Sequence, residues 1–574
     1  MVMDMQRAFG GKNHQDTGTK RIHDFFLRRH VTHTPKTKKE KELPLQKVDR
    51  VKTANIPEIK RRLLPPLRAR LEHLLQSLYN PADVENKTEV PVVEVPRSSG
   101  CPPQHALLSS QTVVCEPVSS EMELADPSRG SVRVFEVVEL EKQRLRLIHW
   151  TRWHNEQAYA RGYKCGITDL DHISAYLDAV TADCAATADI HASFYHVVLP
   201  PEVRCFYRFR DSAGNLYQLR VGAMGHCQMP EVMQIISNVL AGNPKYVQPE
   251  FAVHVPVQVW IDNIRHYGSR ALVKMAQQAL ARNAADLSLE TNIDPIRDEY
   301  DFIGGHFDHT NKTVMAAEKT LKKLPPKIPT QMRAGDVEQL ASRLIFVAGL
   351  TQDPLVNHWW CLKWCRRVAN RLNTGKAHTN EIVSIPPSAQ RSLTQWLEKA
   401  HTPHKVVVGR NGAHATLFCD STPIGYGGVL VTDDNRIYVT GGTFTEEQQQ
   451  GSISAQETWG VTRSFHDFTP SFKKLNIAHL DVIVDNTSTE HNIPKGNTRS
   501  PDIVEPIKKF WQMAIGTQMR LRTGYVSTKI MPADEISRQR PLDIAKVTLA
   551  MRPESQNWRT GQAGRFVGRP PNRQ

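Results

Sequence analysis

Four acidic residues in the C-terminal third of the chain limit its fold more than any other feature. They occur in the order strand, helix, strand and helix: Asp420, Glu457, Asp485 and Asp534. The surrounding pattern predicts two strands within 416–431 joined by a Gly-rich turn, then strand 436–440, helix 453–466, strand 480–485, helix 500–513, strand 521–526 and a last helix from 532. One aspartate at a strand end is usually a turn residue, but four acids in this order indicate a fold that gathers them.

Carboxylates gathered in one site repel one another strongly unless divalent cations bind between them. The βββαβαβα order and its four acids resemble ribonuclease H. The resemblance implies an α/β ribonuclease H fold over residues 411–545, with these catalytic, metal-binding positions: Asp420, Glu457, Asp485 and Asp534. Two Mg²⁺ or Mn²⁺ ions about 4 Å apart would activate water and stabilise the leaving oxygen as the RNA strand of an RNA–DNA hybrid is cut.

Three short phrases narrow the resemblance. They are Asp485-Asn-Thr-Ser, Gly496-Asn-Thr-Arg-Ser-Pro501 and Ala533-Asp-Glu-Ile-Ser-Arg538. They are more similar to the ribonuclease H of DIRS-order retrotransposons, including VIPER-like elements, than to the retroviral enzymes. The similarity extends over residues 131 to about 545.

A second pair of carboxylates lies upstream, between residues 187 and 263. Asp189 and Asp262 each lie at the end of an apolar, strand-like run. Two carboxylates that converge from separate strands can hold a divalent cation, and a pair of such cations can clamp both oxygens of an in-line phosphoryl displacement. Between the two runs, Met224-Gly225 forms a turn that opens a helix-like segment.

The order and spacing of these pieces resemble the polymerase motifs of reverse transcriptases. The family's metal-binding aspartate and the aromatic residue five positions later match Asp189 and Phe194, and its Gly-x4-Pro-x3-Gln segment begins at Gly225 and ends at Gln234. The resemblance implies an α+β fingers and palm region that copies an RNA template from a DNA primer with dNTPs. Phe194 would exclude a 2′-hydroxyl on the incoming sugar, and Gly225 and Gln234 would lie at the nucleotide.

The last polymerase motif departs from the family. Its Tyr-x-Asp-Asp hairpin reads Trp260-Ile-Asp262-Asn263 in this chain. Asn263 still offers an oxygen ligand but removes a charge, so metal affinity should fall. Asp189 and Asp262 would carry most of the coordination, so Asp262 and Asn263 remain catalytic candidates. Two alternatives stay open: a decayed or domesticated copy whose palm is a nucleic-acid scaffold, and a protein active only as ribonuclease H.

Residues 143–150 alternate basic and apolar side chains, as a strand with one face in a groove does. They resemble the fingers of reverse transcriptases, which implies that Arg146 contacts the triphosphate through its guanidinium. Arg152 and Asn155 would then be structural supports. Without the family, a strand with its basic face in solvent would be the better interpretation.

Other segments fill out the domain plan. A hairpin is predicted around Gly214, and residues 300–308 resemble the segment that closes the palm and grips the primer. The plan is a mostly disordered basic region and linker at 1–130 with one helix near Leu71, fingers and palm at 131–325, a helical thumb or connection at 326–410, ribonuclease H at 411–545 and a disordered basic tail at 546–574.

Composition agrees with nucleic acid as a partner. The net charge of +14 favours a polyanion: an RNA template, a DNA primer or their hybrid. Nine scattered cysteines suit a reducing compartment, so nucleus or cytoplasm is expected, the nucleus weakly favoured. Cys361 and Cys365 are expected to pack in a core rather than bind zinc. No apolar run approaches the ~20 residues of a membrane helix, so no membrane partner is expected.

The basic N-terminal region contains a further candidate site. Residues 19–26 place Ile22 three positions before the aromatic pair Phe25 and Phe26. This arrangement resembles a sliding-clamp-binding peptide, which inserts one aliphatic and two aromatic side chains into an apolar pocket. Thr19 replaces the usual leading Gln. A chance amphipathic turn is the alternative.

Overall fold

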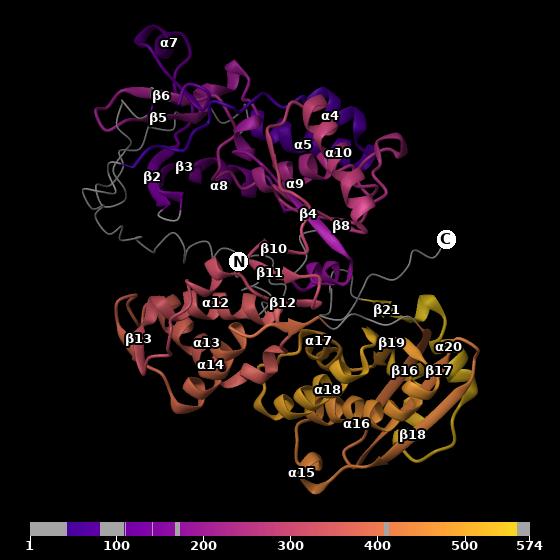
Figure 1. Ribbon diagram of the computed structural model, residues 1–574. Helices are drawn as coiled ribbons and strands as arrows, with labels where there is room; N and C mark the ends of the chain where they lie inside the picture. Colours follow the sequence, from indigo (N-terminus) through magenta and orange to yellow (C-terminus); the bar gives the residue numbers. More distant parts are fainter. Residues whose placement is uncertain are drawn as a thin grey trace. The chain divides into compact units, whose positions relative to one another are not determined.

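The computed structural model shows a mixed α/β protein that divides into two compact units (Figure 1). The N-terminal unit takes in the described residues up to 298 except 173–181, and the C-terminal unit takes in 173–181 and the described residues from 299 onward. None of the described helices combines the length and the apolar character needed to cross a membrane. The structure describes residues 43–80, 108, 111–139, 142–166, 173–406 and 412–558.

A four-stranded antiparallel sheet supports the N-terminal unit. Its order is β7-β8-β4-β9, and its strands are β4 (Cys184–Ile190), β7 (Val257–Trp260), β8 (Asn263–Gly268) and β9 (Thr291–Ile293). Helices α9 (Met229–Leu240) and α10 (Arg270–Asp286) pack against the sheet. Small side chains on β4 allow this approach, since Cys184 and Ala186 are buried against Val273 of α10.

Shorter elements surround this sheet. Strands β2 (Arg133–Glu139) and β3 (Arg144–Trp150) form an antiparallel hairpin, and α8 (Arg152–Ala160) follows. The hairpin predicted around Gly214 is confirmed: β5 (Arg208–Arg210) pairs with β6 (Leu216–Leu219), which also pairs with β1 (Cys115–Pro117). Gly214 has a φ of +90°, and the Asp211 carboxylate accepts the backbone N–H of Ala213 and Asn215.

The expectation of a mostly disordered region over residues 1–130 is wrong for residues 111–125, which contain β1 and α7 (Ser120–Ala125), and for residues 43–80. Residues 43–80 form α4 (Ile56–Arg62) and α5 (Pro65–Tyr79), the latter matching the helix predicted near Leu71. The leucines of α5 are buried in a core that also contains residues of α9. This apolar burial stabilises the segment, although its composition is basic. Residues 1–42, with the predicted clamp-binding side chains Ile22, Phe25 and Phe26, lie outside the described residues.

The C-terminal unit begins with a sheet and three helices. The sheet contains β10 (Glu299–Phe302), β11 (Gly305–Asp308), β12 (Thr313–Ala316) and β15 (His404–Lys405). The helices confirm the helical prediction for 335–400: α12 (Ala334–Leu350), α13 (Trp359–Asn373) and α14 (Pro387–Ala400). Cys361 and Cys365 are buried on α13 with their sulfur atoms 3.9 Å apart, which agrees with the core-packing interpretation.

The hairpin of β10 and β11 lies in a different compact unit from the one that the predicted domain plan gave it. Residues 300–308 were expected to close the palm, but they belong to the compact unit that starts at Glu299. A Cβ atom on Gly304 would lie 3.1 Å from the Phe346 ring, and one on Gly305 would lie 2.8 Å from Leu350. Helix α12 therefore packs directly on this turn, which ties the hairpin to the helices that follow it.

A six-stranded sheet completes the C-terminal unit, in the order β18-β17-β16-β19-β20-β21. Strands β16, β17 and β18 are antiparallel, whereas β16, β19 and β20 are parallel. These bounds match most of the predicted elements: β16 (Ala413–Ser421), β17 (Gly425–Thr432), β18 (Ile437–Thr443), α16 (Ile453–Lys474), β19 (Ile477–Val484), α18 (Val504–Thr517), β20 (Arg520–Tyr525) and α19 (Ala533–Ser537).

Helices cover both faces of this sheet. Successive residues of β16 enter different cores, since Leu417 packs with α16 and α18 while Phe418 packs with α19 and α20 (Ile544–Ala550). The predicted Gly-rich turn is wrong in detail because its glycines lie within β17. A Cβ atom on Gly427 would lie 2.5 Å from the Ser537 nitrogen of α19, and one on Gly428 would lie 2.8 Å from Ser464 of α16.

The disordered tail predicted from residue 546 is wrong for residues 546–558. Helix α20 continues to Ala550 and buries Val547 and Ala550 in the core beside α19. Strand β21 (Asn557–Trp558) then pairs antiparallel with β20 and forms the edge of the sheet. Residues 559–574 lie outside the described part of the chain.

Candidate active sites

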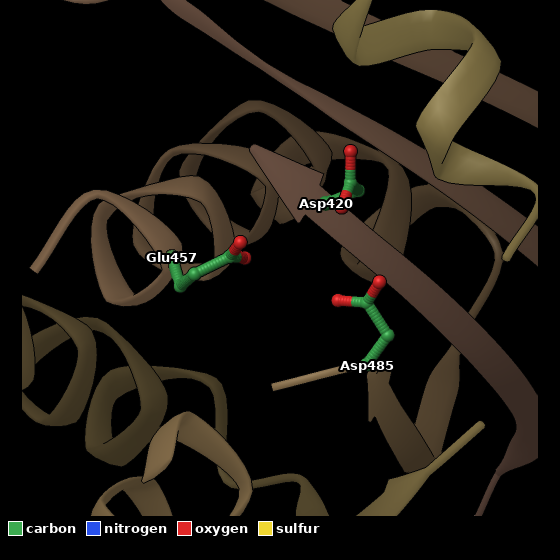
Figure 2. Close-up of side chains that lie close together, drawn as sticks. All are labelled: Asp420, Glu457 and Asp485. Atoms are coloured by element: carbon green, nitrogen blue, oxygen red, sulfur yellow. The ribbon is translucent and has the colours of Figure 1, made fainter. Parts of the chain in front are cut away.

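Three of the four predicted acids of the C-terminal unit meet at one edge of the six-stranded sheet. Asp420 lies near the end of β16 and Asp485 directly follows β19, a parallel neighbour, so the two strands deliver their carboxylates to the same edge. Glu457 reaches them from the first turns of α16. Oxygens of the three carboxylates lie within 4.8 Å of one another, and Figure 2 shows the side chains converging.

Local sequence explains how these side chains are positioned. Gly460 lies one turn after Glu457, and a Cβ atom there would approach the Asp420 carbonyl oxygen to 3.1 Å, so the glycine lets α16 lie close to the end of β16. Asn486 accepts the backbone N–H of Ser488 and Thr489 and thereby begins α17 (Thr487–Lys495) immediately after Asp485.

The electrostatics of this trio favour a bound cation. Burial, and then the charge of its acidic neighbours, raises the pKa of Glu457 to about 8 and the pKa of Asp420 to about 6; burial also raises the pKa of Asp485. Ser537 donates a hydrogen bond to Asp420 and Thr528 donates one to Asp485, and both bonds favour the ionised forms. Carboxylate oxygens are hard ligands that suit Mg²⁺ or Mn²⁺, so the residues fit the expected ions.

Asp534, the fourth predicted acid, lies beside the trio without joining it. Its charge contributes to the raised pKa of both Asp420 and Asp485, which places it close to them. Its own carboxylate accepts a hydrogen bond from Arg538 Nε at 2.7 Å and lies 3.7 Å from Lys546 Nζ. Within the described ranges, the trio is the only group of three His, Cys, Asp or Glu residues close enough to hold one metal ion.

The second site lies in the N-terminal unit, on the central sheet. Asp189 of β4 stands directly opposite Asn263 of β8, and Asp262 occupies the turn between β7 and β8. The Ile190 N–H donates to the Asp262 carbonyl oxygen at 3.2 Å, which joins the turn to the end of β4. Burial and the neighbouring Asp189 charge raise the pKa of Asp262, so the two predicted carboxylates do lie together.

Neutral donors surround these two carboxylates. Asp262 accepts a hydrogen bond from the Ser193 hydroxyl at 3.1 Å and another from the Asn263 side-chain amide at 2.9 Å. Asp189 accepts one from the Asn292 amide at 3.1 Å. Asn263, the residue that departs from the family motif, thus donates to its neighbouring carboxylate where an aspartate would repel it.

Gln234 holds the turn that carries Asp262. It is buried in α9, its side-chain nitrogen donates to the Val259 carbonyl at 3.1 Å, and its side-chain oxygen accepts the Ile261 N–H at 2.6 Å. Ile261 has a φ of +56°, so these two bonds hold a turn that the backbone adopts reluctantly. Gln234 therefore positions the Asp262 turn, and its predicted contact with a nucleotide stays a prediction.

Gly225 lies where two segments approach closely. A Cβ atom there would come within 2.2 Å of the His149 carbonyl oxygen on β3. Asn155 donates to the Gly225 carbonyl at 3.0 Å and accepts the Cys227 N–H at 2.8 Å, which agrees with its expected supporting role. Arg152, the other expected support, forms an exposed ion pair with Glu156. The nucleotide contact of Gly225 stays a prediction.

Arg146 and Phe194 both lie near Asp262. The positive charge of Arg146, on β3, favours the ionised form of Asp262, although one of its guanidinium nitrogens also pairs with Glu139 at 3.2 Å. Phe194 is half-buried in a 3₁₀ turn, Ser193–His196, whose first residue donates to Asp262. Their predicted contacts with the triphosphate and the sugar of a dNTP stay predictions that this placement favours.

Some supporting residues were missed by sequence reasoning. Ser537 lies inside the phrase Ala533–Arg538, which was used for the family resemblance, so the sequence offered a way to find it. Thr528 and Lys546 lie outside all of the phrases that were used. Both of the latter come from segments that only the fold brings to the acids. Glu231, in the predicted palm helix, was also missed: its buried carboxylate accepts two hydrogen bonds from Arg70 of α5, at 2.7 and 2.9 Å.

Comparisons with known proteins gave matches among solved structures. No protein-family model and no curated protein sequence matches the chain. It is similar to the foamy viral protease-reverse transcriptase "dRH" in complex with double-stranded DNA, with 11% identity, a TM-score of 0.41 and coverage of 84% of this chain and 83% of that one. The match to the foamy viral protease-reverse transcriptase in complex with an RNA/DNA hybrid has 11% identity and a TM-score of 0.41, and it covers 84% of this chain and 64% of that one. The match to the same viral protein in complex with double-stranded DNA has 12% identity and a TM-score of 0.40, and it covers 84% of this chain and 99% of that one.

Proposed function

We propose that the chain is a reverse transcriptase with ribonuclease H activity, encoded by a retroelement of the DIRS order. The observation that carries the proposal is the convergence of Asp420, Glu457 and Asp485 within 4.8 Å on a sheet of mixed direction. The trio would hold Mg²⁺ or Mn²⁺, which supplies activation of water and stabilisation of the leaving oxygen. The substrate would be the RNA strand of an RNA–DNA hybrid.

The surrounding residues would keep the trio in place during cleavage. Ser537, on α19, donates a hydrogen bond that orients Asp420. Thr528, in the segment that precedes α19, donates one that orients Asp485. Both hydroxyls donate to a carboxylate and leave its remaining lone pairs for a metal ligand role. Glu457 completes the set from a helix, so all three carboxylates rest on or directly beside regular secondary structure.

The polymerase half of the proposal rests on the second site. Asp189 and Asp262 lie together at the end of a sheet, and Arg146 supplies positive charge toward the same place. An RNA template, a DNA primer and dNTPs would bind there, in keeping with the net charge of +14. We place this activity in the nucleus or cytoplasm, with the nucleus favoured, and retain residues 19–26 as a proposed sliding-clamp ligand.

One observation favours a second candidate function, cleavage without polymerisation. In the described part of the N-terminal unit, no third carboxylate joins Asp189 and Asp262, because Asn263 stands at the expected position. A chain of this kind would degrade hybrid and bind nucleic acid through a palm that does not extend primers.

Cleavage of a hybrid with a labelled RNA strand tests the proposal. Wild type should cut the RNA with Mg²⁺ and stop when EDTA is added, and Asp485→Asn should lose this activity. The matched control is Glu505→Gln, which removes an exposed carboxylate from α18 in the same unit and should cut normally. Equal cutting by wild type and Asp485→Asn would refute the assignment.

A further inference from the structure

Glu231 is a buried carboxylate on α9 that binds groups from two other segments of the N-terminal unit. Only 3% of its side chain is exposed. Its Oε1 accepts a hydrogen bond from Arg70 Nε of α5 at 2.7 Å, and its Oε2 accepts one from Arg70 Nη2 at 2.9 Å. The Tyr163 hydroxyl and the Gly166 N–H, both in the segment after α8, also donate to Oε2, at 3.0 and 3.1 Å. Glu231 therefore joins α5, α9 and the segment that follows α8.

The contacts at this junction leave the carboxylate little freedom. Arg70 Nη2 also donates to the Lys164 carbonyl oxygen at 3.0 Å, so the guanidinium spans α9 and the segment after α8. A Cβ atom on Gly166 would lie 2.7 Å from Glu231 Oε1, so a side chain there would displace the carboxylate. Glu231 lies in the first turn of α9, where the positive end of the helix dipole favours a negative charge. The junction thus fixes where α9 begins relative to α5.

A second set of hydrogen bonds continues from this junction to the Asp262 turn. Glu231 and Gln234 are three residues apart on α9, so their side chains lie about one helical turn apart. Gln234 donates to the Val259 carbonyl and accepts the Ile261 N–H, which holds the turn that carries Asp262. All residues of α9 except Pro230 are buried. A helix packed so closely moves as one body, because its surroundings leave no room for local adjustment.

We propose that Arg70 and Glu231 are positioning residues for the site of Asp189 and Asp262. Their ion pair would fix the position of α9, and Gln234 would transfer that position to the Asp262 turn. The inference rests on the proposed polymerase function. It gives α5 a part in the polymerase site, although this helix precedes residue 131, where the resemblance to reverse transcriptases begins.

The charges of the pair allow positioning to be separated from stability. Without the guanidinium of Arg70, Glu231 would keep a buried charge that only neutral groups bind, which is costly for the fold. In the double variant Arg70→Met with Glu231→Gln, no buried charge is left without a partner, so much of the lost stability should return. The bidentate link between α5 and α9 stays absent in that variant. The double variant should therefore be stable but poorly positioned.

Primer extension and manganese binding by the full-length protein test this inference. Extension at saturating dNTP should fall about tenfold in Arg70→Met and stay low in the double variant, although the melting temperature recovers there. Mn²⁺ binding is measured by electron paramagnetic resonance in a background of Glu457→Gln with Asp485→Asn, which removes the C-terminal site. The affinity of the remaining site should weaken about tenfold in both variants.

Leu74→Ala is the matched control for stability. Leu74 is buried on α5, one turn after Arg70, and its truncation opens a cavity without removing the ion pair. At an equal loss of melting temperature, Leu74→Ala should extend primers and bind Mn²⁺ normally. Arg70→Lys keeps the charge but not the bidentate geometry, so its extension should fall between those of wild type and Arg70→Met.

Two results would overturn the inference. One is normal extension with normal Mn²⁺ affinity in the double variant, and the other is a loss in Leu74→Ala as large as that in Arg70→Met. If Asp189→Ala loses extension in the same assay while Arg70→Met keeps it, the proposed polymerase stands and only the positioning role is rejected. If wild type does not extend and Asp189→Ala leaves its Mn²⁺ binding unchanged, the proposed polymerase function fails together with the inference.

Discussion

The two carboxylate sites differ in what surrounds their acids. In the C-terminal unit three buried carboxylates face one another, and the pKa of each is raised by burial and by neighbouring charge. In the N-terminal unit Asp262 and Asp189 receive hydrogen bonds from Ser193, Asn263 and Asn292. Hydroxyl donors also reach the trio, from Ser537, Thr528 and Ser421. The C-terminal site nevertheless gathers three carboxylates against two, so it should depend on metal for stability more than the N-terminal site.

The largest expected effect separates the two sites by activity. Asp189→Ala should lower primer extension on an RNA template by on the order of 10³-fold, since it removes one of only two carboxylates. Hybrid cleavage should stay within twofold of wild type. Asp183→Ala, which changes an acidic residue just before β4, serves as the control. If Asp189→Ala impaired cleavage as much as extension, the sites would not be independent.

The metal-free C-terminal unit should lose stability as pH rises. Because the folded-state pKa of Glu457 is raised to about 8, its neutral form stabilises the fold fully below the ordinary value of 4.5 and less as pH passes through 8. We expect a loss of roughly 3 kcal/mol between about pH 5 and 8.5 in EDTA. Hydrogen exchange of β16 and β19 measures it, and Mg²⁺ should protect more at the higher pH.

Glu457→Gln is the matched variant for this pH dependence. It keeps the side-chain shape but cannot ionise, so protection of β16 and β19 should change much less with pH. A pH dependence as steep as in wild type would show that Glu457 is not its source.

The N-terminal unit should show the opposite pH dependence. Burial, followed by the charge of His226, lowers the pKa of His154 to about 3, and burial lowers that of His226 to about 3 as well. The neutral rings stabilise the fold fully above the ordinary value of 6.5, and this contribution is lost as pH falls toward 3. At pH 4, the buried neutral state of each ring should lower the free energy of unfolding by about 3 kcal/mol relative to its value above pH 6.5.

His154→Phe tests that expectation by hydrogen exchange of β4 and β8. Phenylalanine can keep the stacking on Tyr207, at 4.3 Å between ring centres, while the titrating group is removed. Because burial also lowers the pKa of His149 and of His266 in the same unit to about 4, the acid sensitivity should shrink by roughly a quarter. His73→Phe, on the exposed side of α5, is the control, and equal acid sensitivity in both variants would reject the role of the buried rings.

The smallest expected effect concerns the support of the turn that carries Asp262. Gln234→Ala removes two hydrogen bonds that hold the Asp262 turn, so extension should fall by roughly 10- to 100-fold, or about 1–3 kcal/mol. Cleavage should be unaffected. Gln277→Ala, a partly exposed glutamine on α10, should extend normally. Normal extension by Gln234→Ala would mean that the turn keeps its conformation without the Gln234 hydrogen bonds.

The sequence predicted most of the sheet and helix order in the C-terminal unit, because its strands and helices are strongly periodic segments, two of which end at an aspartate. It did not predict the placement of Gly425, Gly427 and Gly428 inside β17, since glycine usually marks a turn. Their reason is tertiary: helices approach both faces of that strand. Likewise, the spacing of Gln234 did not reveal its burial under the turn, where it bonds the backbone of Val259 and Ile261.

Contacts made by segments that were expected to be disordered were the hardest to predict. Arg70 meets Glu231 across 161 positions, and Lys546 reaches Asp534 from a helix that was expected to be a disordered tail. Composition described both segments as basic and polar, while their stability comes from apolar contacts with partners elsewhere in the chain.

The most direct test of the central claim is primer extension on an RNA template by the wild-type protein, with Asn263→Asp measured beside it. If two carboxylates supported by neutral donors suffice, wild type should extend the primer with Mg²⁺, and Asn263→Asp should extend faster at low metal concentration. Absence of extension by wild type, with activity appearing in Asn263→Asp, would contradict a working polymerase and leave ribonuclease H as the remaining function.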